Sequence, residues 1–329
     1  MQIDLRTVTI KPLRHTFSHV ARRLGDKPAS RYQEGTLDLQ ADVNFHYRPL
    51  WDPEHEIFDA GRTAVVMADW YAFKDPRQFY YGTYTMARAK QQEAAESAFD
   101  FVEDRGLIEM LPPDVRELAL QVLLPLRHLE WGGNMNNSAI CAYGFGAAVT
   151  QPAMFHAMDH LGIAQYLTRI GLELADPAVL DQAKEAWMND AVWQGLRRYI
   201  ENTFVLSDWF ELFVAQNLVL DGLIYPLVFE AFDKALTRRG GGAISMLTQF
   251  MREWRNESVK WVDATIKTAA AESPANLALL QGWVANWRAQ AYEAVKPLAE
   301  LALGQEAGAA LDDIATAFDR NLNKLGLSR

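Results

Sequence analysis

The 329-residue sequence contains a single cysteine, Cys141, and this scarcity excludes several kinds of site. One cysteine cannot form an intramolecular disulfide, and it cannot build a zinc site from several thiolates. Its neighbours are Ala, Ile and Tyr, and apolar surroundings keep a thiol protonated, so Cys141 is a poor nucleophile. Such sparing use of cysteine is typical of a reducing compartment, and we expect the chain to be cytoplasmic.

Long basic runs are also missing. The chain has 32 Lys and Arg against 42 Asp and Glu, which gives a net charge of −10. Because nucleic acid and anionic lipid both attract cationic surfaces, we expect neither nucleic acid nor a membrane as a partner. The first residues include an early Asp and no apolar run, so we expect no signal peptide. The longest uncharged stretch, 131–158, contains too many Gly, Asn and Pro residues for an isolated membrane span.

The most informative absence concerns metal ligands. A di-iron site in a helical bundle takes two Glu-x-x-His pairs and two further Glu residues, because residues three apart share a helix face. None of the seven histidines has Glu three residues before it. Only Asp52-x-x-His55 has a carboxylate there, and Pro49 and Pro53 argue against a regular helix around it. We therefore predict no catalytic, cofactor-binding or metal-binding residue in this chain.

His156 and His160 are the strongest remaining metal candidates. They are four residues apart and would share a helix face, with Asp159 beside them. Two histidines at this spacing bind zinc when a third ligand is near. In metalloproteases Glu directly follows the first histidine, and here Ala157 stands at that position. We therefore favour a polar helix face or an interface over a metal role.

Two apolar segments carry polar residues whose role the sequence leaves open: Arg127, His128, Glu130, Asn134, Asn136 and Asn137 in the first, and Glu211, Gln216, Asn217 and Asp221 in the second. Buried polar groups have to be hydrogen-bonded or paired. The set forms either a relic or variant metal centre, or a structural polar network in a core or interface. We favour the network because no histidine has an acid partner at ligand spacing.

Helical periodicity dominates from residue 75 onward. Asp75-Pro76 predicts the start of a helix that runs to about 105, and Pro112-Pro113 opens another, with a bend or break near Gly133-Asn134. Further helices are expected at about 152–174, 178–202, 205–238, 243–272, 276–303 and 308–325, separated by Gly and Pro residues. The segment 205–232 is apolar nearly all round, which predicts a central, buried helix.

Residues 1–75 have a different character. Prolines at 12, 28, 49 and 53 interrupt short apolar pieces, and no helical period lasts. We predict an extended, irregular N-terminal arm over 1–75 and an all-α helical domain over 76–329. The arm either wraps its own helical body or contacts a neighbouring subunit, and Trp51, Trp70 and Tyr71 suit both roles.

Several stretches resemble the β subunits of phenol hydroxylase oxygenases: GDKPASRYQE (Gly25–Glu34), NFHYRPLWDP (Asn44–Pro53), DPRQFYYG (Asp75–Gly82), PLRHLEWGGNMNNS (Pro125–Ser138), WQGLRRYIE (Trp193–Glu201), DWFELFVAQNLVLDGL (Asp208–Leu223) and FMREWRNESVKWVDA (Phe250–Ala264). These stretches extend over most of the chain. The resemblance implies a ferritin-like (ribonucleotide reductase-like) bundle within the bacterial multicomponent monooxygenases.

The resemblance also implies a function. The hydroxylase of this family contains two copies each of α, β and γ subunits. The α subunit holds a carboxylate-bridged di-iron centre, and β lacks the ligands, which makes this chain a non-catalytic scaffold. The complex would convert phenol to catechol with O2 and electrons from NADH, supplied by a reductase with FAD and a 2Fe-2S cluster. A regulatory protein also binds the hydroxylase.

Other functions remain open at this point. The nearest alternative is the β subunit of a toluene or other aromatic monooxygenase. More distant ones are a metal-binding oxygenase with atypical ligands and a metal-free binding protein that works alone.

Overall fold

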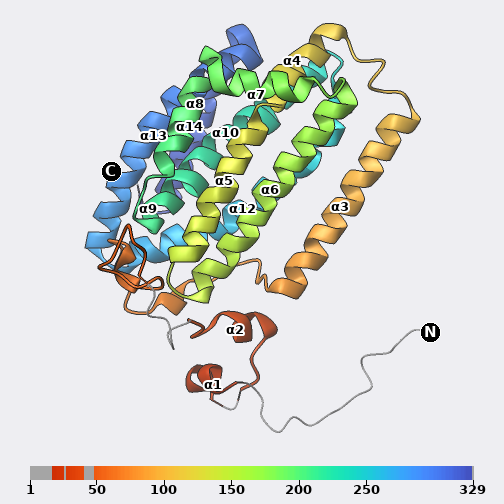
Figure 1. Ribbon diagram of the computed structural model, residues 1–329. Coiled ribbons are helices and arrows are strands. Elements are labelled where there is room, and N and C mark those ends of the chain that lie inside the picture. The colour runs from red at the N-terminus through yellow and green to blue at the C-terminus, as the bar shows by residue number, and fades with distance from the viewer. Residues whose placement is uncertain (1–16, 26, 41–47, 328–329) are drawn as a thin grey trace, which may run out of the picture.

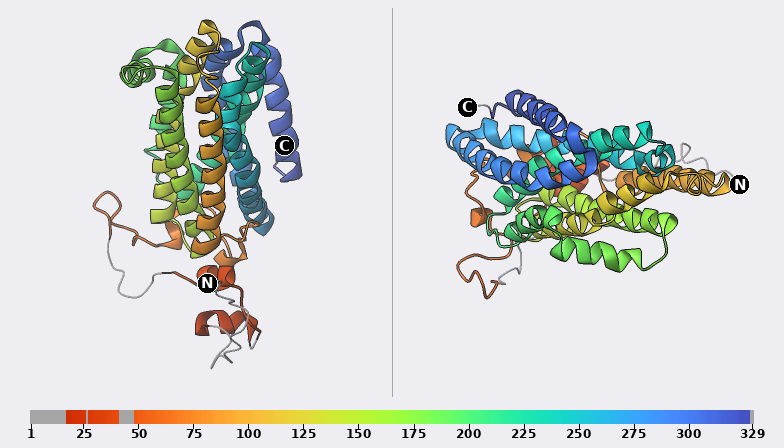
Figure 2. Two further views of the ribbon diagram at one scale, coloured as in Figure 1. Left: turned by 90° about the vertical axis from the view of Figure 1, so that its right-hand side faces the viewer. Right: turned by 90° about the horizontal axis from the view of Figure 1, so that it is seen from above.

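The computed structural model describes residues 17–25, 27–40 and 48–327. Within these ranges all the regular secondary structure is helical. The predicted all-α fold is confirmed. The helices of the bundle run side by side along one axis, and α7 (Val179–Asn189) lies across one end of it (Figures 1 and 2). The bundle helices are α3 (Tyr81–Asp104), α4 (Pro113–Leu123), α5 (Leu126–Tyr143), α6 (Ala147–Leu174), α8 (Ala191–Thr203), α12 (Gly242–Glu272), α13 (Pro274–Leu303) and α14 (Ala307–Lys324).

The centre of the bundle is one continuous helical run, Trp209–Arg238. It consists of α9 (Trp209–Phe213), a π-helical segment (Val214–Leu220), α10 (Asp221–Pro226), a second π-helical segment (Leu227–Phe232) and α11 (Asp233–Arg238). Among the described residues this is the one helix long and apolar enough to cross a membrane, and 94% of its most apolar window is buried by the protein itself. It is therefore the central core helix that the sequence predicted.

Helices α5 and α6 form an antiparallel hairpin against this central run (Figure 1). The sequence predicted a bend or break near Gly133, but α5 continues through it from Leu126 to Tyr143. The glycines serve close packing instead. A Cβ at Gly132 would lie 2.6 Å from the Ile200 side chain, and one at Gly133 would lie 2.7 Å from His160 Nδ1.

The boundaries of three predicted helices need correction. Asp75 does not cap a helix: it lies buried in a loop, pairs with Arg77 at 2.9 Å, and α3 begins only at Tyr81. The helix expected at 178–202 is two helices, α7 and α8, that meet at Asp190. Helix α6 begins before Pro152, directly after Gly146, whose φ of 85° marks the true boundary.

The described part of the arm holds α1 (Ser18–Leu24), α2 (Arg31–Thr36) and two short 3-10 turns (Ala60–Arg62 and Trp70–Ala72). Helices α1 and α2 lie beyond one end of the bundle (Figure 1). The later arm packs on its own helical body: the Ala64 amide donates to Asp208 at 2.7 Å, and Trp70 lies 5.7 Å from Trp209. Residues 1–16 and 41–47 of the predicted arm lie outside the described residues.

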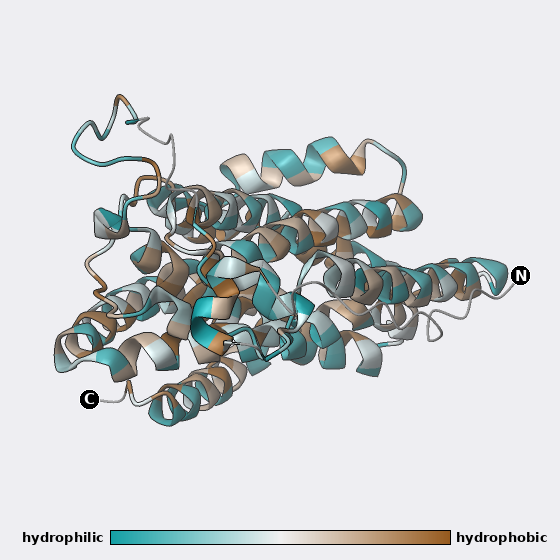
Figure 3. Cartoon of the chain, turned by 90° about the horizontal axis from the view of Figure 1, so that it is seen from below, coloured by the Kyte–Doolittle hydropathy of each residue, from teal (hydrophilic) through white to brown (hydrophobic). Residues whose placement is uncertain are grey.

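The helices carry hydrophobic and hydrophilic residues in alternation along their lengths (Figure 3). This is the pattern of amphipathic helices that bury one face each. The last helix follows it with one buried stripe of Leu311, Ile314, Phe318 and Leu322. The stripe docks on this chain, since α14 packs against α13 and α10.

Candidate functional site

Four ionisable side chains meet in the centre of the bundle: Glu130 from α5, His156 and His160 from α6, and Asp221 from α10. We call these four residues the inner cluster. Each is at most 2% exposed. Charged groups at this depth have to be paired or must change their protonation state, so their geometry decides their chemistry.

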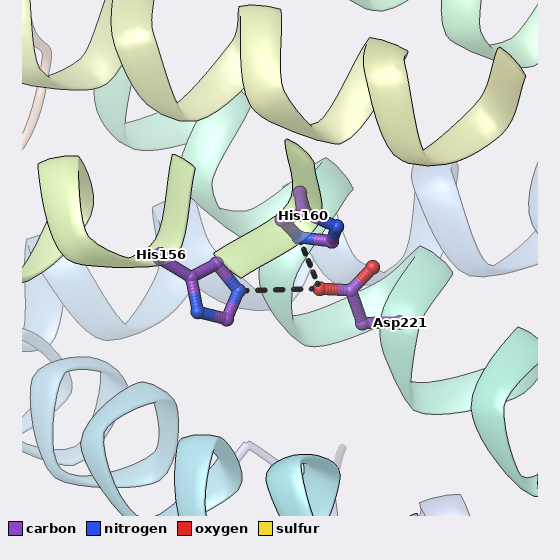
Figure 4. Close-up of side chains that lie close together, drawn as sticks. All are labelled: His156, His160 and Asp221. Atoms are coloured by element: carbon purple, nitrogen blue, oxygen red, sulfur yellow. Dashed lines mark hydrogen bonds and ion pairs between the residues drawn. The ribbon is translucent and has the colours of Figure 1, made fainter. Parts of the chain in front are cut away.

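Both histidine rings point at the same carboxylate oxygen (Figure 4). His156 Nε2 and His160 Nε2 each lie 3.5 Å from Asp221 Oδ2. These three atoms all lie within 4.8 Å of one another. On its other side His160 Nδ1 lies 2.6 Å from Glu130 Oε2, and the Tyr225 hydroxyl donates to Glu130 at 2.9 Å.

Local sequence explains why the rings converge. His156 and His160 are one helical turn apart, so both project from the same face of α6. Gly133 gives the His160 ring its place against the α5 backbone, because a side chain there would overlap the ring. From α12, the Trp254 ring stacks on His156 with centroids 4.9 Å apart, and Trp261 lies 5.2 Å from it.

Two pairs of buried amides lie next to the inner cluster, between α5 and the central helix. Gln216 donates to Asp221 Oδ1 at 2.9 Å and accepts from Asn136 at 2.8 Å. Asn137 and Asn217 donate to each other at 2.9 and 2.8 Å. All four amides are buried and hydrogen-bonded, as a structural polar network requires.

The charges of the two histidines differ. Burial alone lowers the pKa of His160, but the carboxylates of Asp221 and Glu130 outweigh it and raise that pKa to about 10. Burial lowers the pKa of His156 to about 4, against a smaller opposing effect of Asp221. The carboxylates thus favour a proton on His160, whereas burial disfavours one on His156.

The two carboxylates also respond in opposite directions. Burial raises the pKa of Glu130, against the opposing effect of His160. Burial would raise the pKa of Asp221 as well, but His160 and His156 overcome it and hold that pKa well below its usual range. Asp221 is thus the fixed anion of the inner cluster.

Asp159, which the sequence placed beside the histidines, faces the other way. It accepts from Arg88 at 2.6 and 2.7 Å, from Tyr84 at 2.9 Å and from Trp254 Nε1 at 2.8 Å. Arg88 also bonds to Glu257 at 2.8 Å. We call these five residues the outer cluster, which lies between α3, α6 and α12.

Other residues singled out in the sequence make their contacts elsewhere. Arg127 donates to the Leu180 carbonyl at 2.6 Å, and Asn134 donates to the Ala157 carbonyl at 2.9 Å. His128 stacks on Trp187, Glu211 accepts from Trp287 at 2.9 Å, and His55 pairs with Asp52 at 2.9 Å in the arm. Burial lowers the pKa of His128 to about 4 and raises the pKa of the Cys141 thiol, which agrees with the poor nucleophile predicted there.

The inner cluster does not fit a carboxylate-bridged di-iron centre. Such a centre takes four carboxylates and two histidines from four helices. Here α5, α6 and α10 supply two carboxylates and two histidines, and α12 contributes the indole rings of Trp254 and Trp261 at the same level. A single ion could reach three donor atoms, those of His156, His160 and Asp221.

Sequence reasoning missed the meeting of Asp221 with the histidines. His156 and Asp221 are 65 residues apart, and their contact depends on how α10 docks against α6. A usable signal was Glu130-x-x-Gly133, where an acid on an apolar helix precedes a glycine on the same face. A buried carboxylate next to the space that a glycine leaves predicts that a polar side chain from another helix occupies that space.

Comparisons with known proteins identify the family of the chain. A family model described as Methane/Phenol/Alkene Hydroxylase matches residues 51–273. The oxygenase component DmpL of phenol 2-monooxygenase from Pseudomonas sp. (strain CF600) is 53% identical, over 99% of this chain and 98% of that protein. The component MhpL from Acinetobacter pittii (strain PHEA-2) is 46% identical with the same coverage. The hydroxylase component subunit beta of the toluene-4-monooxygenase system from Ectopseudomonas mendocina is 26% identical, over 84% and 87% of the chains.

Solved structures give the same result. A chain of the xenon-pressurized phenol hydroxylase from Pseudomonas sp. OX1 matches with a TM-score of 0.92 and 46% identity, over 98% of both chains. A chain of toluene 4-monooxygenase matches with a TM-score of 0.76 at 22% identity, over 89% of this chain and 99% of that one, which supports the fold alone. These relatives are components of multisubunit hydroxylases, so this chain too has partner subunits. The chain belongs to the methane/phenol/alkene hydroxylase family, as a β-type subunit of a phenol hydroxylase oxygenase component.

Proposed function

We propose that this chain is the non-catalytic β subunit of a phenol hydroxylase, and that it scaffolds a larger α subunit that holds the di-iron centre. The donor set at the centre of the bundle carries the proposal. Two of the carboxylates that a di-iron centre needs are missing. On the side of the cluster that α12 faces, the rings of Trp254 and Trp261 pack against His156. No catalytic, cofactor-binding or metal-binding residue is therefore assigned to this chain.

The complex in this proposal contains two copies each of α, β and γ and acts in the cytoplasm. It converts phenol to catechol with O2, and a reductase with FAD and a 2Fe-2S cluster supplies electrons from NADH. A regulatory protein binds the hydroxylase. Relatives at 53% and 46% identity are phenol 2-monooxygenase components, whereas the toluene relative reaches only 26%, so phenol is the better-supported substrate.

Exposed apolar side chains on the α5–α6 hairpin support the role of a subunit. Trp131 and Met135 on α5 and Met154 and Met158 on α6 are between 38% and 50% exposed, and the sequence between 131 and 158 has no charge. Exposed large apolar side chains in an uncharged segment are typical of protein that a partner chain covers. A rigid helical body beside α would hold the helices of α in place.

Iron content and assembly test the proposal directly. The chain is produced alone and together with the α and γ subunits, and iron and molecular mass are measured for both samples. We expect no iron in the chain alone and a large, iron-containing complex on co-expression. Stoichiometric iron in the chain alone would instead favour a metal-binding oxygenase with atypical ligands, for which His156, His160 and Asp221 are the candidate donors.

We also propose that the arm, residues 1–75, contacts the α subunit. Deleting residues 1–45 should prevent stable association with α, measured by co-purification. Tyr32→Phe is the matched control, since it removes only the bond from the Tyr32 hydroxyl to the Asp75 amide (2.7 Å). A truncated chain that still assembles fully with α would refute this role of the arm.

A further inference from the structure

We propose that the inner cluster binds a proton at the centre of the bundle, with His160 held as a buried imidazolium between Glu130 and Asp221. The inference rests on the proposed function, because a subunit without iron has to neutralise its interior carboxylates in another way. The imidazolium then links three helices, α5, α6 and α10, through ionic contacts.

The position of the His160 ring is the first argument. Its Nδ1 lies 2.6 Å from Glu130 Oε2, and its Nε2 lies 3.5 Å from Asp221 Oδ2. A neutral imidazole has a single N–H and would turn a lone pair toward one of the two carboxylates. An imidazolium turns an N–H toward each carboxylate. The short contact with Glu130 is typical of a charge-assisted hydrogen bond, and the longer contact with Asp221 is an ion pair without a hydrogen bond.

The charges around the ring are partly balanced by this assignment. Glu130 on α5 and Asp221 on α10 supply two negative charges when both are ionised, and His160 supplies one positive charge. Arg255 on α12 lies beside the inner cluster, but its Nε donates to the backbone carbonyl of Asp221, at 3.3 Å, and not to a carboxylate. Tyr225 on α10 adds a neutral hydroxyl to Glu130. Buried ions persist when they are paired in this way.

The remaining groups around the ring are neutral or face elsewhere. His156 stacks on Trp254 and contacts one carboxylate, that of Asp221, whereas His160 contacts two. Asp159, the next residue on α6, is satisfied by Arg88 in the outer cluster. His160 is therefore the group of the inner cluster that carries the proton.

A metal ion fits this place poorly. Structural zinc sites are closed and have four protein ligands, whereas catalytic sites have three and remain open to water. Among the described residues, His156, His160 and Asp221 offer three donor atoms, and each is at most 2% exposed. The inner cluster has three donor atoms, as a catalytic zinc site does, but it is buried like a structural zinc site. A proton needs neither a fourth ligand nor access for water.

The charges of the neighbouring carboxylates act in the same direction as this geometry. The carboxylates of Asp221 and Glu130 raise the pKa of His160 to about 10 in spite of the opposing effect of burial. The ring is thus protonated across the physiological range. Gly133 has no side chain, and this leaves room on α5 for the imidazole ring beside Glu130.

Paired substitutions in the full-length chain test the inference. His160→Gln leaves two buried carboxylates without their shared cation, so we expect a large fall in Tm. The double variant His160→Gln/Asp221→Asn removes one charge of each sign, and we expect it to recover at least half of that fall. Arg288→Gln/Asp319→Asn, at an exposed pair, is the matched control and should change Tm little.

The outcome remains decisive if the single variant does not fold. Recovery of soluble, folded protein by His160→Gln/Asp221→Asn is then the expected result. If Asp221→Asn folds alone but the double variant gives no recovery over His160→Gln, the imidazolium does not balance Asp221 and the inference is wrong.

A metal probe separates this inference from the proposed function. Co2+ is added to the full-length chain, and visible absorption and bound cobalt are measured. We expect no stoichiometric binding. Stoichiometric cobalt that is lost in His160→Gln would overturn both the inference and the metal-free subunit. A failed recovery without bound metal overturns only the inference.

Discussion

Two adjacent residues of α6, Asp159 and His160, belong to two polar clusters that neutralise buried carboxylates in different ways. In the outer cluster Asp159 faces Arg88, whose guanidinium is always charged and whose side chain is 18% exposed. In the inner cluster the cation is His160, which carries charge only while it holds a proton and is fully buried. Only the inner cluster therefore has a cation that loses its charge when the pH rises toward 10.

Trp254 joins the two clusters. Its Nε1 donates to Asp159 at 2.8 Å, and its ring stacks on His156 with centroids 4.9 Å apart. One indole thus fixes the outer carboxylate and covers the inner histidine. Helix α6 therefore has two ion pairs of different kinds. The pair of Asp159 with Arg88, nearer the solvent, does not depend on a titrating cation, whereas the pairs of His160 in the core require a protonated ring.

The largest expected effect comes from breaking the outer cluster. Asp159→Ala leaves Arg88 and the Trp254 N–H without their main acceptor, and breaking a buried pair costs about 3–5 kcal/mol. Urea unfolding of the full-length chain measures the loss. A loss as small as that of an exposed pair would show that water, and not Asp159, satisfies Arg88.

The next effect concerns the space that the inner cluster needs. Gly133→Ala places a Cβ about where the His160 ring lies, 2.7 Å from Nδ1, and such overpacking costs roughly 1–3 kcal/mol. Gly162→Ala is the matched control on α6, because its Cβ would meet nothing within 4 Å. We expect that control to stabilise the chain by roughly 0.5–1 kcal/mol, and equal effects of both changes would contradict the packing argument.

The pH dependence of stability should distinguish the clusters. The lowered pKa of His156, about 4, means that its contribution is present above pH 6.5 and is lost as the pH falls from 6.5 toward 4. The raised pKa of His160, about 10, means that its contribution is present below pH 6.5 and is lost as the pH rises toward 10. The free energy of unfolding from these two groups is therefore greatest near pH 6.5.

Chemical unfolding at several pH values measures this profile. His156→Gln should flatten the acid side and leave the alkaline side in place. A stability that stays level from pH 6.5 to 10 would mean that His160 does not hold an extra proton in the folded chain.

The smallest effect gives the baseline for the comparison. Arg288 and Asp319 form a 2.7 Å pair at the surface, with side chains 35% and 51% exposed. Arg288→Ala should cost less than about 1 kcal/mol in urea unfolding, because solvent screens such pairs. A cost equal to that of Asp159→Ala would remove the distinction between buried and exposed pairs.

Much of the fold could be predicted because helical periodicity is a local property. The central helix, the α12 to α14 segments and the shared face of His156 and His160 all follow from spacings of three and four. Helix boundaries were predicted wrongly where the same residue type is compatible with two local structures. Asp75 can cap a helix or pair with Arg77, and the ion pair prevailed. Asp190 separates two helices that have no Gly or Pro between them.

The candidate site was predictable only in part. The absence of Glu-x-x-His pairs predicts that the chain holds no di-iron set, and this stays a prediction. The meeting of Asp221 with His160 did not follow, since it requires the docking of α10 against α6 after a long intervening stretch. Tyr225 and Trp254 have the same reason for being missed, because their partners come from other helices.

The π-helical segment Val214–Leu220, directly before Asp221, has a consequence for how the chain tolerates changes in length. A π turn holds one residue more than an α turn, so a one-residue deletion there converts it to α-helix and leaves both flanks facing as before. The same deletion between His156 and His160, in regular α-helix, would rotate one ring away from the other by about 100°. Single-codon deletions should therefore be tolerated far better before Asp221 than between the histidines.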